Sequence, residues 1–325
     1  MISLPDRSEV VRTVRVVGRR TLTSRVIELE MEPLPGDVLP SWEPGAHIDV
    51  RLGDDMVRQY SLVPSPSGRK DTWTVAVLVE QEGRGGSLLI ESDLHIGDSV
   101  MTSGPRNHFS FVEAESYLFI AGGIGITPLI AMCLAAEVSG SRWRLVYLGH
   151  ERESMAYLEA LEQEFPGKVE VYASSEGRRL DVYSAVAEGE PNQHVYCCGP
   201  ERLMSAVENA MESMERLPFV HIEHFHPRDV ETSENTEFVV HAVASDVEFV
   251  VPIDESILMA ADFEGVIVPG DCLEGTCGSC ETRVLSGAVE HRDSILSTEA
   301  RRSSRTMMIC VSRARPGCKR LELDL

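Results

Sequence analysis

Four cysteines in the last third of the chain restrict its fold more than any other feature. Cys272, Cys277 and Cys280 follow the spacing C-x4-C-x2-C, and Cys310 comes after a long gap. This spacing is typical of a plant-type [2Fe–2S] cluster, which takes four thiolates. A structural zinc site usually has paired C-x2-C motifs, and this sequence has one such pair. The cysteines therefore predict a cluster-binding, one-electron carrier domain.

The length and charge of the chain limit its binding partners. A chain of 325 residues suits two or three domains. Its formal net charge of −22 argues against nucleic acid. The N-terminus has no apolar signal core, and Gly122, Gly123, Gly125 and Pro128 interrupt the uncharged run at 117–136. We expect a cytoplasmic monomer without a membrane segment.

Hydrophobic patterning divides the chain into three predicted domains. Residues 1–110 contain short β-branched stretches between turns, which is typical of an antiparallel barrel. Residues 111–226 alternate strands with helices and predict a parallel sheet with helices on both faces. A polar linker at 227–236 precedes the cluster domain at 237–325.

Two motifs in the barrel region indicate a phosphate-binding site. Arg58 and Tyr60 alternate onto one face of a strand, where the arginine can hold a phosphate and the ring can stack on a flat ligand. The glycine-rich segment Gly83–Ser87 precedes a short helix and can offer backbone amides to an anion. A solvated strand-end charge and an ordinary turn are the alternatives for each motif alone. Together they suggest a flavin phosphate site.

A second glycine-rich turn, Gly122–Pro128, joins a predicted strand to a helix in the parallel-sheet region. We expect Thr127 to cap this helix and Pro128 to occupy its first turn. Such a turn can bind a pyrophosphate, although Pro128 stands where G-x-G-x-x-G has its last glycine. Cys198 lies at another strand–helix junction, at the sheet edge where ligands bind. A buried structural cysteine is the alternative interpretation of Cys198.

The order R-x-Y-S, G-G-I-G-I-T-P, C-C-G-P and C-x4-C-x2-C resembles that of the ferredoxin–NADP reductase superfamily. More narrowly, it is similar to the phthalate dioxygenase reductase and vanillate demethylase reductase branch. The likeness covers essentially the whole chain and includes His291-Arg292-Asp293 and the ending Leu-Asp-Leu. It implies a flavin-binding antiparallel β-barrel, an α/β parallel-sheet nucleotide domain and an α+β ferredoxin-like (β-grasp) domain.

The resemblance also implies roles for individual residues. Ser61 would lie near the flavin N5, Tyr60 and Phe225 would pack on the isoalloxazine, and Cys198 would lie near the nicotinamide. FMN would be bound by Arg58, Tyr60, Ser61, Ala76, Val77, Leu78, Arg84, Gly85, Gly86, Ser87 and Phe225. The nicotinamide dinucleotide would be bound by Gly122, Gly123, Gly125, Thr127, Pro128, Cys198, Gly199 and Pro200. The irons would be bound by Cys272, Cys277, Cys280 and Cys310.

The choice of nucleotide depends on the segment after the strand at 169–173. Glu176 could accept hydrogen bonds from the adenosine ribose, which favours NADH. The neighbouring serines and arginines could instead hold a 2′-phosphate. The phthalate dioxygenase reductase branch favours NADH, and we therefore expect NADH to be the electron donor.

These sites together predict an electron-transfer enzyme. A nicotinamide delivers hydride and an iron–sulfur cluster takes single electrons, so a flavin must lie between them. The resemblance implies transfer from NADH through FMN and the cluster to a Rieske-type aromatic-ring oxygenase or demethylase, and the C-terminal cluster domain favours FMN over FAD. A reductase for a haem-thiolate monooxygenase and a non-enzymatic iron–sulfur redox sensor are the alternatives.

Overall fold

The computed structural model describes residues 10–53, 56–228 and 232–325. The chain divides into two compact units, Met1–Glu223 and His224–Leu325. The division falls three residues before the predicted boundary at 226, and the exact boundaries of the three predicted domains stay predictions. Part of the predicted linker, residues 229–231, lies outside the described residues.

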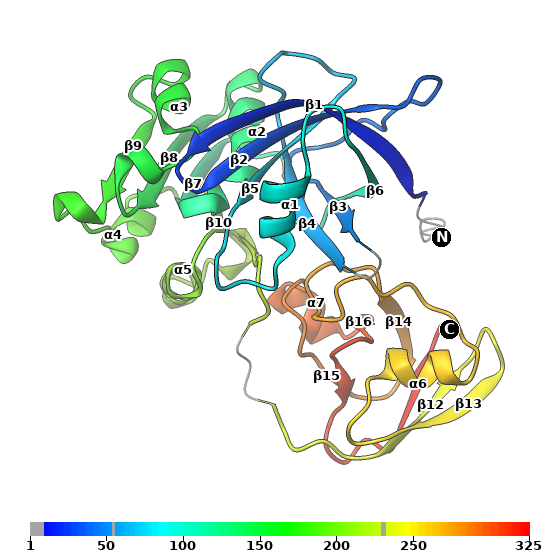
Figure 1. Ribbon diagram of the computed structural model, residues 1–325. Helices are drawn as coiled ribbons and strands as arrows, with labels where there is room; N and C mark the ends of the chain where they lie inside the picture. Colours follow the sequence, from blue (N-terminus) through cyan, green and yellow to red (C-terminus); the bar gives the residue numbers. More distant parts are fainter. Residues whose placement is uncertain (1–9, 54–55, 229–231) are drawn as a thin grey trace. The chain divides into compact units, whose positions relative to one another are not determined.

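The first part of the first unit is a closed barrel of six antiparallel strands (Figure 1). The strand order is β1-β2-β5-β4-β3-β6. Large apolar side chains such as Leu29, Ile48 and Leu62 are fully buried inside it, and each contributes about 1.5–3 kcal/mol through burial. The barrel elements are β1 (Arg12–Thr23), β2 (Val26–Pro33), β3 (His47–Leu52), β4 (Met56–Val63), β5 (Trp73–Leu78), α1 (Gly86–Asp93) and β6 (Ser99–Arg106).

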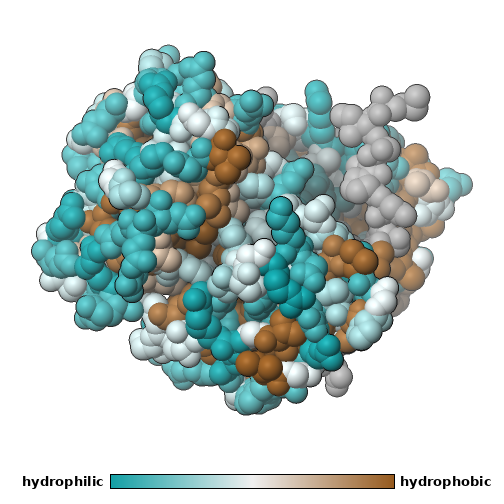
Figure 2. Space-filling view, turned by 90° about the horizontal axis from the view of Figure 1, so that it is seen from above, coloured by the Kyte–Doolittle hydropathy of each residue, from teal (hydrophilic) through white to brown (hydrophobic). Residues whose placement is uncertain are grey.

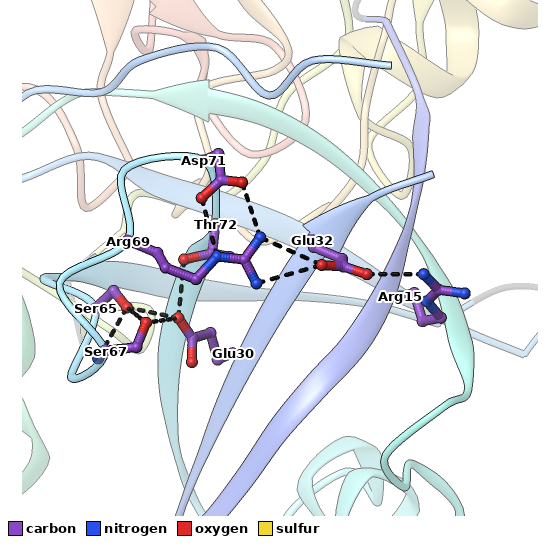
Figure 3. A network of polar contacts seen from close by, with 8 residues as sticks. All are labelled: Arg15, Glu30, Glu32, Ser65, Ser67, Arg69, Asp71 and Thr72. Carbon is purple, nitrogen blue, oxygen red and sulfur yellow. Dashed lines mark hydrogen bonds and ion pairs between the residues drawn. The ribbon is translucent and has the colours of Figure 1, made fainter. Parts of the chain in front are cut away.

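A polar network ties the β4–β5 connection to β1 and β2 (Figure 3). Arg69 forms ion pairs with Glu32 at 3.3 Å and Asp71 at 2.8 Å, and Glu32 also accepts from Arg15 at 2.7 Å. Burial raises the pKa of Glu30, but hydrogen bonds to its carboxylate outweigh this and hold the pKa below its usual value. Those bonds come from the hydroxyls of Ser65, Ser67 and Thr72.

The second part of the first unit is a five-stranded parallel sheet of order β11-β10-β7-β8-β9. Every residue of its central strand β7 is buried, as expected for a sheet covered on both faces. Phe119 packs in a core with α2 and α3, whereas Leu118 packs in the opposite core with α5. The elements are β7 (Ser116–Gly122), α2 (Thr127–Val138), β8 (Arg142–Gly149), α3 (Leu158–Glu164), β9 (Val169–Ala173), α4 (Val182–Ala187), β10 (His194–Cys198), α5 (Glu201–Ser213) and β11 (Val220–Glu223).

One local prediction for this sheet differs from the structure. Thr127 is not the cap of α2: the helix begins at Thr127 itself, and its hydroxyl donates to the carbonyl of Ile124 at 3.0 Å. The reason is that the 3-10 turn Gly123–Ile126 (η1) leads directly into the helix, so no extended capping residue intervenes. Helix α3 begins at Leu158, because Tyr157 adopts a left-handed conformation with φ 62°. Pro128 is in the first turn of α2, as predicted.

The second unit is an α+β domain built on a mixed sheet of order β13-β12-β18-β14-β16. β12 and β18 run parallel, and β12 pairs antiparallel with β13. Phe238, Val240, Ile257 and Leu321 are among the residues of its buried core. The elements are β12 (Phe238–Ala242), β13 (Val247–Val251), α6 (Ile257–Phe263), β14 (Glu281–Ser286), β15 (Val289–Glu290), α7 (Thr298–Ser303), β16 (Thr306–Met308), β17 (Arg313–Ala314) and β18 (Arg320–Leu323).

Hydrophilic residues predominate on the face of the protein that Figure 2 shows, and apolar residues form separate patches there. Acidic residues outnumber basic ones by 52 to 30. Across the described ranges, no helix is both long and apolar enough to cross a membrane.

Candidate functional site

Strand β4 presents its predicted flavin residues on two faces. Tyr60 packs against the barrel core beside Leu62. Ser61 alternates to the other face with Val63, which is buried in the core of the nucleotide region together with Met132. The alternation along β4 therefore places Ser61 on the side of the barrel that faces the parallel sheet.

Ser61 has a neighbour that the sequence reasoning missed. His47 on β3 is the cross-strand partner of Ser61, so the two side chains share one face. The hydroxyl of Ser61 and Nε2 of His47 are buried and have no hydrogen-bond partner among the described residues. Burial holds the pKa of His47 well below its usual value, and nearby Arg106 lowers it further, so the imidazole is neutral. These two polar atoms lie on paired residues of neighbouring strands. They could form hydrogen bonds with the polar edge of a bound ligand, such as a flavin.

The structure brings Arg58 against the glycine-rich turn at the start of α1. A Cβ on Gly86 would lie 2.7 Å from Cγ of Arg58, so only glycine allows this contact. The guanidinium also donates to the carbonyl of Arg84 at 3.3 Å. Gly85, with φ 84°, caps α1, and the hydroxyl of Ser87 accepts from the backbone of Glu80 at 3.0 Å. A guanidinium beside the amides of a helix N-terminus fits a phosphate.

The ladder between β5 and β4 is shorter than the ladder between β5 and β2. β5 pairs with β2 along its whole length, but its ladder with β4 ends at the pair of Leu62 and Val75. The backbone of Ala76, Val77 and Leu78 therefore continues beyond the β4 ladder. Backbone groups at such an edge suit a ligand with hydrogen-bonding groups, such as the FMN that the resemblance assigns to these residues.

Two turns interlock at the carboxyl edge of the parallel sheet. A Cβ on Gly125 would lie 2.3 Å from the carbonyl oxygen of Cys198, and a Cβ on Gly122 would lie 2.5 Å from Cδ of Pro200. A Cβ on Gly199 would lie 2.8 Å from Cα of Gly122. The two predicted dinucleotide-binding segments are therefore in direct contact, and glycine is required for their close approach.

Glu223 is a second residue that sequence reasoning missed. It ends β11, and its Cα is paired with that of Cys198 at the end of β10. Burial raises the pKa of Glu223 to about 8, and Oε2 is buried without a hydrogen-bond partner in the part of the chain described. Burial also raises the pKa of the Cys198 thiol, and the carboxylate of Glu223 adds to this effect. Two neutral acids at the ligand-binding edge of a sheet are a candidate proton-handling pair.

The predicted nucleotide-selecting residue Glu176 lies in the 3-10 turn Ser174–Glu176 (η3), directly after β9, and is exposed. Nδ1 of His150 lies 3.0 Å from the hydroxyl of Ser174. Arg178 stacks over the ring of Tyr172 at 4.7 Å, which directs that guanidinium toward β9. The role of Glu176 stays a prediction, as does that of Phe225, which belongs to the second unit and is 39% exposed there.

The four predicted cluster cysteines gather in the second unit. Cys277, Cys280 and Cys310 are buried, and Cys272 is half-buried. Backbone amides of Glu274 and Thr276 donate to Sγ of Cys272 at 3.3 and 3.5 Å. Contact with the thiols of Cys277 and Cys310 lowers the pKa of Cys272. Cys310 also contacts Cys280, so the four sulfurs form one connected group.

This donor set fits a two-iron cluster. Four sulfurs with backbone amides directed at them are the ligand set of a [2Fe–2S] centre, in which each iron takes two thiolates. Among the described residues, no group of three or more Cys, His, Asp or Glu side chains is arranged so that it could hold one metal ion. The thiolates of a two-iron cluster are instead divided between its two metals.

The cluster loop is supported by the segment His291–Ser294. Gly275, with φ 70°, lies against Asp293: a Cβ there would lie 3.0 Å from Cα of Asp293. The amide of Ser294 donates to the carbonyl of Gly275 at 2.9 Å. The fully buried carboxylate of Asp293 accepts from the amide of Leu296 at 2.8 Å. In the sequence, His291-Arg292-Asp293 was noted only as part of the family resemblance. The structure shows that this segment packs against the cysteine loop at Gly275.

Comparisons with known proteins agree with this geometry. The family model of the 2Fe-2S iron-sulfur cluster binding domain matches residues 240–315. Phthalate dioxygenase reductase of Burkholderia cepacia is 34% identical over 317 residues, which cover 96% of this chain and 97% of the relative. The solved structure of a phthalate dioxygenase reductase, described as modular for electron transfer from pyridine nucleotides to [2Fe-2S], matches with 33% identity and a TM-score of 0.68 over 97% of this chain and 98% of that chain.

A second kind of protein is also similar. An intact type IV self-sufficient cytochrome P450 monooxygenase matches with 39% identity and a TM-score of 0.89 over 97% of this chain. The matched region is 41% of that longer chain. The likeness therefore concerns one part of the P450 protein and leaves its remaining length outside the comparison.

Proposed function

Because the chain belongs to the phthalate dioxygenase reductase family, we propose that it is the NADH-dependent reductase of an oxygenase system that uses FMN and a [2Fe–2S] cluster. Membership makes it an electron-transfer oxidoreductase with a C-terminal cluster domain. The proposed acceptor is a Rieske-type aromatic-ring oxygenase or demethylase. The cytoplasmic location and monomeric state stay predictions from the sequence.

One observation supports the proposal most strongly. In the first unit, Ser61 lies on the barrel face whose neighbour Val63 is buried in the core of the nucleotide region. The hydroxyl of Ser61 and Oε2 of Glu223, which find no hydrogen-bond partner among the residues that the structure describes, thus belong to two regions packed against each other. A flavin on β4 and a nicotinamide at the end of β10 would meet between such regions.

The residues of this chain would divide the work of the reaction. FMN, when bound, supplies the ability to take a hydride and release electrons singly. Arg58 and the amides at Gly85 and Gly86 would hold its phosphate. Ser61 would donate a hydrogen bond near the reacting ring, and Cys198 would exclude water from the nicotinamide. Glu223 would hold a proton on its carboxyl until the pH approaches its raised pKa of about 8.

The choice of NADH rests on the sheet edge after β9. Glu176 is exposed there, where it can accept hydrogen bonds from a ribose. Stacking on Tyr172 and the ion pair with Glu170 at 3.9 Å direct Arg178 toward β9. These contacts favour a nucleotide without a 2′-phosphate. A kcat/KM for NADPH equal to or above that for NADH would contradict this choice.

A cytochrome P450 monooxygenase is the second candidate acceptor. The specific observation in its favour is the 39% identity to the self-sufficient P450 protein, above the 33% for the phthalate dioxygenase reductase structure. Reconstitution with each class of oxygenase separates the two. The Rieske proposal expects NADH-driven reduction of a Rieske centre, and the alternative expects the 450 nm band of a reduced P450 under carbon monoxide.

The reductase activity itself has a direct test. Purified protein should contain about two irons and one FMN per chain and should reduce cytochrome c with NADH. A redox sensor without enzymatic function would show no sustained NADH oxidation with an added acceptor. That result would overturn the proposed function.

A further inference from the structure

We propose that the exposed face of α6 and the groove between α6 and β13 form the surface that binds the protein electron acceptor. The acceptor would present an apolar side chain surrounded by basic residues. The inference rests on the proposed electron-transfer function and adds a docking surface to it.

Helix α6 has two faces of different character. Ile257, Leu258 and Ala261 are buried in the core of the second unit. Met259 and Phe263 are 59% and 89% exposed, and their spacing of four residues places them on one side of the helix. Large aromatic and methionine side chains left in water beside charged residues are typical of protein-binding surfaces.

A groove lies beside this face, between α6 and β13. Its volume is about 500 Å³. Its apolar lining is contributed by both elements, by the segment between them and by Val239 of the neighbouring strand β12. The lining residues are Val239, Phe249, Val250, Pro252, Ala260 and Phe263. Three carboxylates, those of Glu248, Glu255 and Glu264, also line it. That of Glu248 forms an ion pair with Arg320, so the attraction for a basic partner rests on Glu255 and Glu264. An apolar hollow with acidic residues suits a partner residue that is apolar and flanked by lysine or arginine.

The buried side of α6 is connected to the cluster ligands. The amide of Leu258 donates to the carbonyl of Ile309 at 3.1 Å, and Ile309 directly precedes Cys310. A Cβ on Gly270, two residues before Cys272, would lie 2.3 Å from Cδ2 of Leu258. The helix therefore packs against both segments that carry ligands. A partner on its outer face would be separated from those segments by about one helix diameter, ~10 Å.

The charge of the surface argues for an acceptor protein over a second copy of this chain. A two-fold dimer would place the same patch against itself, and the carboxylates of Glu255 and Glu264 would face their equivalents. Like charges across an interface oppose association. A basic acceptor meets no such repulsion, and the net charge of −22 would steer it toward this protein.

The test uses the full-length protein with its cofactors, reduced by dithionite and mixed rapidly with cytochrome c, a basic one-electron acceptor. Phe263→Ala should lower the second-order rate constant of cluster reoxidation about 10-fold, the effect of losing a central apolar contact. Val138→Ala is the matched control, because Val138 is 88% exposed but lies in the other unit. The double variant Glu255→Lys, Glu264→Lys should also slow the reaction and weaken its dependence on salt.

Several results would overturn the proposal. Wild-type reoxidation in Phe263→Ala would do so, as would equal slowing in Val138→Ala. A wild-type dimer that Phe263→Ala makes monomeric, with no change in rate, would assign the face to self-association. The paramagnetic resonance spectrum of the reduced cluster must stay the same in all variants. Because dithionite bypasses the nucleotide, a failure of NADH to reduce wild type would count against the proposed function and leave this test intact.

Discussion

Cys198 and Glu223 are aligned as neighbours at the carboxyl ends of the parallel strands β10 and β11. Burial raises the pKa of both side chains, and that of Glu223 rises to about 8. Both are therefore protonated at neutral pH. A neutral pair at this edge would suit the uncharged ring of a reduced nicotinamide, which the proposed function places here.

Glu223 should make the stability of the protein depend on pH. Between about pH 4.5 and pH 8 the folded state keeps the proton that the unfolded carboxyl has lost, so stability should fall as pH rises through this window. The slope is up to about 1.4 kcal/mol per pH unit for one proton. Glu223→Gln should remove this slope, as measured by melting temperatures at pH 5, 6.5 and 8. The exposed Glu212→Gln on α5 is the control, and an unchanged slope in Glu223→Gln would refute the assignment.

Gly125→Ala should disrupt the contact between the two turns that are predicted to bind the nucleotide. The added methyl group would lie 2.3 Å from the carbonyl oxygen of Cys198, so the backbone must move. Overpacking of this kind costs about 1–3 kcal/mol, and we expect at least 10-fold weaker NADH binding by titration. Gly123→Ala is the control: Gly123 has φ 55° but open space around it, so only conformational strain is added. Equal effects of the two variants would contradict a steric cause.

Arg58→Ala should weaken FMN binding through the loss of a phosphate contact. A charge-assisted hydrogen bond contributes about 1.5–3 kcal/mol, which is about 10- to 100-fold in affinity. Flavin fluorescence titration measures this, and riboflavin, which lacks the phosphate, should bind variant and wild type alike. Arg19→Ala, on the same barrel, is the control, since Arg19 donates to the carbonyl of Glu91. Equal losses for FMN and riboflavin would mean that Arg58 does not bind the phosphate.

Asp293→Asn should weaken the support of the cluster loop. The buried carboxylate accepts from the amides of Ile295 and Leu296 and lies 3.7 Å from the guanidinium of Arg301. Removing one partner of a buried ion pair costs about 3–5 kcal/mol. The cluster absorbance should therefore bleach at a lower temperature than in wild type. Asp246→Asn is the control because Asp246 is 99% exposed, and matching bleaching curves would rule out the bracing role.

The sequence predicted the elements whose chemistry is local. The cysteine spacing predicted a group of sulfurs that the structure brings into contact, because a short loop needs few long-range contacts to form. The barrel and the parallel sheet followed from periodicity, since strands with one or two buried faces have different patterns. The glycine turn at Gly122–Pro128 was located correctly, but the capping role of Thr127 was wrong because η1 continues into α2.

Residues that depend on distant contacts escaped prediction. His47 and Glu223 carry no motif, and their importance comes from burial against neighbouring strands that are remote in sequence. The proposed docking face on α6 could not be predicted either. In the sequence, Phe263 is indistinguishable from a buried apolar helix residue, and only the structure shows that it is 89% exposed. Asp293 was noticed only by resemblance, and its contact with the loop at Gly275 depends on the tertiary fold.

The central claim is that one chain passes electrons from NADH to a cluster held by Cys272, Cys277, Cys280 and Cys310. Low-temperature paramagnetic resonance of anaerobically purified protein, mixed with excess NADH, tests it most directly. The account predicts the signal of a reduced [2Fe–2S] cluster in wild type, and in Cys277→Ser a flavin that NADH still reduces without that signal. A wild-type sample that stays silent after both NADH and dithionite would contradict the account.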